Sequence, residues 1–204
     1  MTAPALRDQV RRVFGPHALN WGLFYVNEPA LRFELSGGDG YIEMFTRAWD
    51  RAREILAAAF PDAAELTVVL SEAGGGGMLG RLSSIRALRD CGIRVPRPYE
   101  AWSETAGPEW DHEERVFLAF TCDREMVNRL LWGVLANELG IRPRLPSQLY
   151  LADLRGGVLA HPYDDRGMDL IGPNHDLLRQ LYTRFDPWLL PYDRERMDSF
   201  FAGR

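Results

Sequence analysis

The feature that most constrains the fold is the stretch 149–171, LYLADLRGGVLAHPYDDRGMDLI, in which two turn sequences separate three short apolar runs. After the first run, the glycines of Arg155-Gly156-Gly157 permit the positive φ angles that a tight turn needs. In the second turn, 163–167, aspartates can accept backbone hydrogen bonds and Gly167 can occupy the end of the turn. Short apolar runs separated by turns predict an antiparallel three-stranded meander. The expected strands are residues 149–154, 158–162 and 168–172.

Elsewhere, two kinds of apolar pattern predict further elements. Alternating or continuous apolar runs predict strands near 31–35, 66–70 and 116–120. Apolar residues spaced three or four apart predict helices over 1–14, 40–60, 79–91, 124–139, 174–185 and from 193 onward. We therefore expect one α+β domain over residues 1–204, with a mixed, mostly antiparallel sheet, a C-terminal three-strand meander, and four or more flanking helices.

The clearest helix, 40–60, carries one apolar stripe with Asp39 placed to cap its start, and Asp123 and Asn174 are placed to cap the helices at 124–139 and 174–185. The stripe consists of Ile42, Phe45, Trp49, Ala52, Leu56 and Ala59.

Composition excludes several classes of chemistry. All 24 basic residues are arginine, so no lysine is present to form a Schiff base, bind a phosphate in a Walker loop or act as a general base. A net charge of −5 argues against general binding to nucleic acid or to an anionic membrane. Cys91 and Cys122 stand in no metal or disulfide motif, and the N-terminus lacks an apolar signal core. These features predict a cytoplasmic protein with reduced thiols.

The polar turn region contains the candidate catalytic residues. His161, Asp164, Asp165 and Asp169 could support acid–base chemistry or bind a divalent metal. The alternative is structural, because aspartates in turns commonly accept backbone N–H groups. The spacing does not decide between the two, since His161 and Asp169 could face each other across the turn, but turn-forming and N–H-capping roles explain most of these residues and favour the structural interpretation.

Four further side chains near the C-terminus are candidates for binding. Arg166 and Arg194 could bind a carboxylate or phosphate, or could form structural ion pairs with Asp165, Asp169 or Asp193 that hold the meander to the terminal helices. Trp188 and Tyr192 are expected to hold the last two helices together.

Charge is distributed unevenly in the middle of the chain. An arginine-rich stretch, 81–97, precedes an acidic segment that contains Glu100, Glu104, Glu109, Asp111, Glu113 and Glu114. The acidic segment is either ordinary solvated surface or a surface that attracts a basic partner. The run Gly74–Gly77 lies between a predicted strand and a predicted helix, where phosphate-binding loops occur. It lacks a complete phosphate-binding motif and is more typical of a flexible connection.

The C-terminal third resembles a known family. The sequence 162–169, PYDDRGMD, is followed by Leu181-Tyr182 and then by 188–194, WLLPYDR. This combination is similar to the signature of a bacterial family described only as a domain of unknown function. The resemblance extends to 31–35, LRFEL, and to Arg47, Ala48 and Arg51, and it is strongest from about 149 to 201. It implies family membership and carries no activity.

With no complete catalytic or cofactor motif, the sequence favours a non-catalytic, cytoplasmic protein-binding module. By analogy of size and charge it would be immunity-like, binding a basic partner through the 100–114 segment and the 163–169 turn, with no cofactor, nucleic acid or membrane. The alternative is a metal-assisted hydrolase or acid–base enzyme that uses the 161–169 residues. A third hypothesis is nucleotide binding at Gly74–Gly77.

Overall fold

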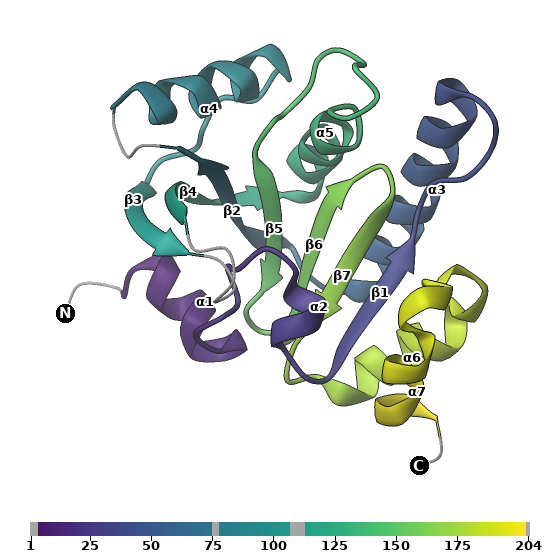
Figure 1. Ribbon diagram of the computed structural model, residues 1–204. Coiled ribbons are helices and arrows are strands. Elements are labelled where there is room, and N and C mark those ends of the chain that lie inside the picture. The colour runs from purple at the N-terminus through teal and green to yellow at the C-terminus, as the bar shows by residue number, and fades with distance from the viewer. Residues whose placement is uncertain (1–3, 75–77, 107–112, 203–204) are drawn as a thin grey trace.

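A computed structural model describes residues 4–74, 78–106 and 113–202 (Figure 1). The predictions that concern Gly75 to Gly77, Glu109 and Asp111 lie outside these ranges. The helices are α1 (Leu6–Phe14), α2 (Leu23–Val26), α3 (Tyr41–Ala59), α4 (Met78–Asp90), α5 (Arg124–Leu135), α6 (His175–Arg184) and α7 (Arg194–Phe201), with the 3-10 turns η1 (Asp186–Trp188) and η2 (Pro191–Asp193). The strands are β1 (Ala30–Glu34), β2 (Glu65–Ala73), β3 (Tyr99–Ala106), β4 (Glu113–Asp123), β5 (Gln148–Asp153), β6 (Val158–Asp164) and β7 (Gly167–Ile171).

Across the described residues, the strands form one seven-stranded sheet in the order β1-β7-β6-β5-β2-β4-β3. Every neighbouring pair in this order is antiparallel. The predicted C-terminal meander is confirmed as β5, β6 and β7, and the mixed α and β composition is confirmed as well. The meander occupies the middle of the sheet rather than its edge, because β1 adds to β7 and β2 adds to β5.

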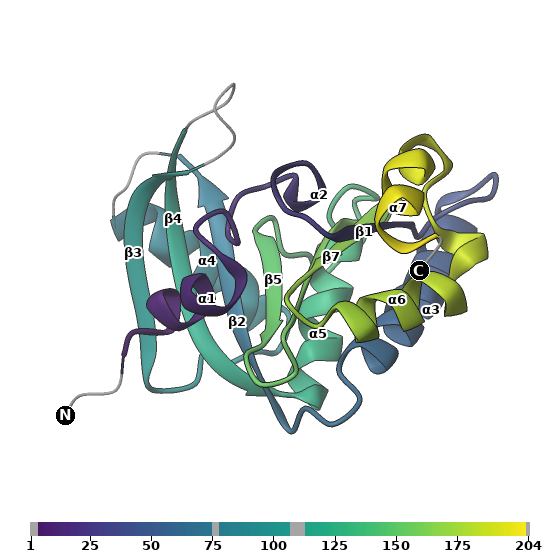
Figure 2. The same ribbon diagram turned by 90° about the horizontal axis from the view of Figure 1, so that it is seen from below.

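Helices cover both faces of the sheet. Figures 1 and 2 show α1 and α2 on one face and α3, α4 and α5 on the other. The second face carries the apolar side chains of β2 and β4, among them Val68, Leu70, Leu118 and Phe120, all of which are buried. Alternation along each strand sends the intervening residues to the first face, beneath α1 and α2.

Two elements were not expected from sequence. Between the elements predicted at 1–14 and 31–35 lies the single-turn helix α2, and β3 occupies part of the segment interpreted as an acidic surface. The β3 sequence, YEAWSETA, is poor in the β-branched residues that usually indicate a strand. It forms a strand because β4 pairs with it along its whole length, from Tyr99–Phe120 to Ala106–Glu113.

The prediction for the helix at 40–60 was wrong about the residues at its N-terminus. The helix begins at Tyr41 after Gly40, and no side chain caps it, so Asp39 does not act as the cap. Ile42 is 82% exposed and does not belong to the buried stripe, because this first turn extends beyond the elements that cover the rest of the helix. By contrast, Asp123 and Asn174 accept hydrogen bonds from Met126 N and Leu177 N, which confirms both predicted caps.

Both cysteines are buried, as expected for Cys91 in the core. Burial raises the pKa of Cys122 to about 12, so this thiol stays protonated at neutral pH. Within the described ranges, no helix is both long and apolar enough to span a membrane.

Candidate functional site

A row of polar side chains crosses the sheet face beneath α2. Strand register places Arg32 of β1 opposite Asp169 of β7, and Asp169 opposite His161 of β6. The ring of Tyr150, on β5, stacks on His161 with centroids 4.4 Å apart. These four residues, called here the polar row, are all buried. The expectation that His161 and Asp169 face each other is therefore confirmed by register.

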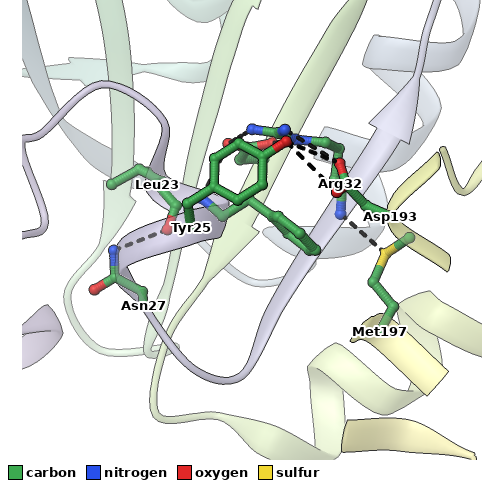
Figure 3. A network of polar contacts seen from close by, with 8 residues as sticks. Leu23, Tyr25, Asn27, Arg32, Asp193 and Met197 are labelled. Atoms are coloured by element: carbon green, nitrogen blue, oxygen red, sulfur yellow. Dashed lines mark hydrogen bonds and ion pairs between the residues drawn. The ribbon is translucent and has the colours of Figure 1, made fainter. Parts of the chain in front are cut away.

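Arg32 is the centre of the densest interactions in the row. Its Nε and Nη2 donate to the two carboxylate oxygens of Asp169 at 2.7 and 2.9 Å, and its Nη1 donates to Asp193 at 3.2 Å (Figure 3). Asp169 also accepts from the backbone N–H of Phe24, at 3.1 Å. One guanidinium therefore connects β1, β7 and the segment leading into α7, while Asp169 also contacts α2.

Aromatic rings enclose the same guanidinium. The Cζ atom of Arg32 lies 4.9, 4.5 and 5.9 Å from the ring centroids of Phe24, Tyr25 and Tyr163. Burial lowers the pKa of Arg32, but hydrogen bonds to Asp169 and its charge outweigh that effect, so the pKa lies above its ordinary value. The guanidinium of Arg32 therefore stays charged, and the carboxylates of Asp169 and Asp193 neutralise it, as expected of a structural network of ion pairs.

His161 occupies the centre of the row as a neutral imidazole. Its Nδ1 lies 2.8 Å from the carbonyl oxygen of Leu149, and its ring lies between Tyr150 and Tyr163. Burial lowers the pKa of His161, more than the backbone hydrogen bond and the Asp169 charge raise it. The unfolded state therefore binds a proton at a higher pH than the folded state does.

This difference predicts a stability that falls with acidification. Above about pH 6.5 the imidazole is neutral in both states, and below it the unfolded state gains the proton first, so stability decreases by up to about 1.4 kcal/mol per pH unit until the folded-state pKa is reached. Urea unfolding between pH 7.5 and 5 should show a shallower pH dependence for His161→Gln than for the natural protein. The matched variant His175→Gln, at an exposed position, should retain the natural slope; equal slopes in all three would contradict the assignment.

The turn between β6 and β7 uses its two aspartates differently. Asp164 accepts from the backbone N–H of Arg166 at 2.8 Å and from its guanidinium, Nε at 2.9 Å. Asp165 is 1% exposed, and its Oδ2 has no hydrogen-bond partner among the described residues. Burial, and then the negative charge of Asp164, raise the pKa of Asp165. The ionised Asp165 therefore costs the folded state free energy at neutral pH.

Replacing this carboxylate with an amide should be stabilising. Asp165→Asn removes the buried charge, and we expect the free energy of unfolding at pH 7 to rise by about 1 kcal/mol, the scale of one unsatisfied polar group. The gain should shrink as the pH falls, because protonation relieves the same cost in the natural protein. Asp176→Asn, at an exposed position, serves as the control in the same denaturant titrations; a loss of stability in Asp165→Asn would refute the argument.

The candidate acid–base residues do not form a common metal site. Asp169 is bound to Arg32, Asp164 to Arg166, and His161 to a backbone carbonyl. In the parts of the chain that are described, no group of three or more His, Cys, Asp or Glu side chains is placed to hold a metal ion. These ion pairs and hydrogen bonds can link β1, β6 and β7 to the C-terminal segment. In the β6–β7 turn, Oδ2 of Asp165 is the one buried side-chain acceptor without a hydrogen-bond partner among the described residues.

The C-terminal binding candidates divide into paired and exposed residues. Arg194 forms ion pairs with Asp186 and Asp198, the latter at 2.7 Å. The ring of Trp188 stacks on Phe185, and its centroid lies 5.4 Å from Cζ of Arg51. Trp188 therefore contacts α3 as well as the end of α6. Tyr192 is 87% exposed, so its expected role of holding the last helices together is wrong. Tyr182 of α6 joins the two helices instead, since its hydroxyl donates to Asp198 of α7 at 2.6 Å and its ring stacks on Phe201.

Three of the four described acids of the 100–114 segment already bind other groups of the same chain. Glu100 accepts from the backbone N–H of Leu6, at 2.7 Å, and Glu104 pairs with Arg11 of α1. Glu113 pairs with the buried Arg115, whereas Glu114 is exposed. The basic helix α1 therefore already binds Glu100 and Glu104, two of the acids that were expected to attract a partner.

A groove that the sequence did not indicate lies at one end of the sheet. Its volume is about 830 Å³, and its floor includes Thr67, Thr121 and Ala152, which are adjacent in register on β2, β4 and β5. Around this floor stand α1, the loop after α3, the β5–β6 turn and the start of α6. Its charged lining residues are Asp62, Glu65, Asp153 and Arg155. The groove could not be found from sequence because its wall residues are spread from 6 to 177 and share no local pattern.

Comparison with known proteins assigns the chain to a family but gives it no activity. No curated protein and no solved structure matches the chain. A family model described as a domain of unknown function (DUF3885) matches residues 6–193, which include the polar row, the β6–β7 turn and the lining residues of the groove. The chain therefore belongs to the family of the domain of unknown function DUF3885.

Proposed function

We propose that the protein is a non-catalytic protein-binding module, bacterial and cytoplasmic, that receives a basic segment of a partner in the acidic groove. The observation that carries the proposal is the charge of the groove lining, three carboxylates against one guanidinium. Asp62 and Glu65 are exposed on its rim, where they can attract and then contact Arg or Lys side chains. An immunity-like role would be one form of such binding.

The internal pairing of the polar row supports binding over catalysis. A catalytic acid or base must reach a substrate, whereas His161 and Asp169 are buried and hold protein partners. The groove, by contrast, is open and lined by both polar and apolar residues. A concave surface with a few charged groups is the usual character of a binding site.

The test reverses charge at the rim and compares it with an equal change elsewhere. Asp62→Lys with Glu65→Lys should weaken binding to Arg- and Lys-rich members of a random twelve-residue peptide array by about tenfold or more, because attraction becomes repulsion. Asp50→Lys with Glu54→Lys changes the net charge equally, but on exposed positions of α3, and should bind these peptides as the natural protein does. Binding that is unselective for basic peptides, or unaffected by the rim variant, would refute the proposal.

A further inference from the structure

The charged side chains that line the groove are not engaged by the rest of the described chain. Among the described residues, no ion pair or hydrogen bond involves the carboxylate of Asp62 or Glu65 or the guanidinium of Arg155. Asp153 uses Oδ1 to accept from two backbone N–H groups of the β5–β6 turn, at 3.0 and 2.8 Å. The groove acids therefore differ from the acids of β3 that α1 already binds, and they are available to a partner.

The floor of the groove also contains a buried hydroxyl that no described protein group binds. Thr67 is 5% exposed and belongs to the groove lining, on the sheet face that carries α1. Its hydroxyl makes no hydrogen bond with any other group in the described ranges, whereas buried hydroxyls are ordinarily hydrogen-bonded. Thr121, its register partner on β4, is half-buried in the same floor. The floor therefore offers acceptor oxygens to a group that enters the groove.

Strand geometry brings one of the free carboxylates close to this hydroxyl. Glu65 and Thr67 are two residues apart on β2, so their side chains point to the same face from Cα atoms about 6–7 Å apart. Thr121 lies across from Thr67 at about 5 Å between Cα atoms. A ligand group that donates hydrogen bonds in two directions can therefore bind the carboxylate and a hydroxyl at the same time.

We propose that the groove selects arginine over lysine as the basic residue of the partner segment, an inference that rests on the proposed function. One edge of a guanidinium can donate two parallel hydrogen bonds to the Glu65 carboxylate, while its remaining N–H groups reach the hydroxyl of Thr67. A lysine ammonium donates from a single atom, so it pairs with the carboxylate as a point charge and leaves the buried hydroxyl unbound. The aliphatic stem of the arginine would pack on Leu6 and Leu177 of the groove wall.

The test compares three acetylated twelve-residue peptides of Gly and Ser that carry three Arg, three Lys or three citrulline residues at the same positions. In NMR titrations of the natural protein, the Arg peptide should bind about tenfold more tightly than the Lys peptide, because its charged head makes an additional hydrogen bond. It should also shift the amide resonances of Glu65, Thr67 and Thr121. The citrulline peptide keeps the shape of arginine without its charge and should bind at least tenfold more weakly than the Arg peptide.

A variant then tests the hydroxyl itself. Thr67→Val keeps the shape of the side chain but removes its hydroxyl, so the preference for the Arg peptide should fall to about twofold or less, with the affinity for the Lys peptide unchanged. Thr105→Val, the same change at an exposed position of β3 outside the groove, should keep the full preference. The comparison of the Arg and Lys peptides on the natural protein does not depend on either variant.

The outcomes separate this inference from the proposed function. Equal binding of the Arg and Lys peptides, with both weakened in the Asp62→Lys, Glu65→Lys variant, would refute the arginine preference and leave the proposed function intact. A preference for arginine that survives Thr67→Val, or resonance shifts confined to residues outside the groove, would also refute the inference. Citrulline binding as tightly as arginine and lysine would refute both, because charge would then contribute nothing.

Discussion

Arg32→Met should destabilise the protein by about 3–5 kcal/mol, because it leaves Asp169 and Asp193 buried without their common cation. The side chains of both aspartates are almost fully buried, so water cannot replace the lost guanidinium without opening the structure. Methionine retains much of the aliphatic volume, which limits the contribution from a cavity. Urea unfolding at pH 7, followed by circular dichroism, measures the difference.

The control for this prediction is an arginine in an exposed ion pair. Arg47→Met breaks the Arg47–Glu43 pair on the surface of α3, and we expect a change below about 0.5 kcal/mol. If Arg32→Met unfolds too far to be measured, Asp193→Asn tests the same network more gently, since it keeps a hydrogen-bond acceptor near Arg32. If Arg32→Met lowers the free energy of unfolding no more than Arg47→Met does, the ion pairs of Arg32 with Asp169 and Asp193 contribute little to stability.

Gly172→Ala should have the second largest effect, a loss of about 2–5 kcal/mol. Gly172 has a φ of +150°, which L side chains rarely adopt, and an added Cβ would collide with the carbonyl oxygen of Gly157. The neighbouring atoms are backbone and cannot rotate away, so strain of about 1–3 kcal/mol and a comparable overpacking cost should combine. Thermal unfolding monitored by calorimetry would report the loss as a lower Tm.

Gly40→Ala provides the comparison for Gly172→Ala. Gly40 has a negative φ and no atom within 4 Å of an added Cβ, so alanine should change stability by no more than about 1 kcal/mol. Similar losses in the two variants would mean that the crowding at Gly157 is relieved by a shift of the β5–β6 turn.

Local signals in the sequence were sufficient for most elements. The apolar runs identified six of the strands because each of those strands has at least one buried apolar face. The turns around Gly157 and Gly167 fixed the meander, since turn chemistry acts over only a few residues. Asp123 and Asn174 indicated helix starts for the same local reason.

The candidate site shows where local reasoning failed. Arg166 binds Asp164, two residues away, and not one of the expected partners Asp165, Asp169 and Asp193; Asp169 finds its cation 137 residues away in Arg32. In the alternating run 31–35, Arg32 lies on the polar face, and no local pattern indicated that it is buried. Its burial depends on Phe24 and Tyr25 above it and on Asp193 beside it, which come from three separate parts of the chain.

The sequence by itself determined the α+β class, the antiparallel meander and the family membership, because these depend on periodicity and on residues close together in the chain. Only the tertiary structure decided that the acids of 161–169 are largely matched by other protein groups, that α1 covers Glu100 and Glu104, and that the groove exists. Those features depend on which distant segments meet, and the free energy of such contacts is not encoded in any local pattern.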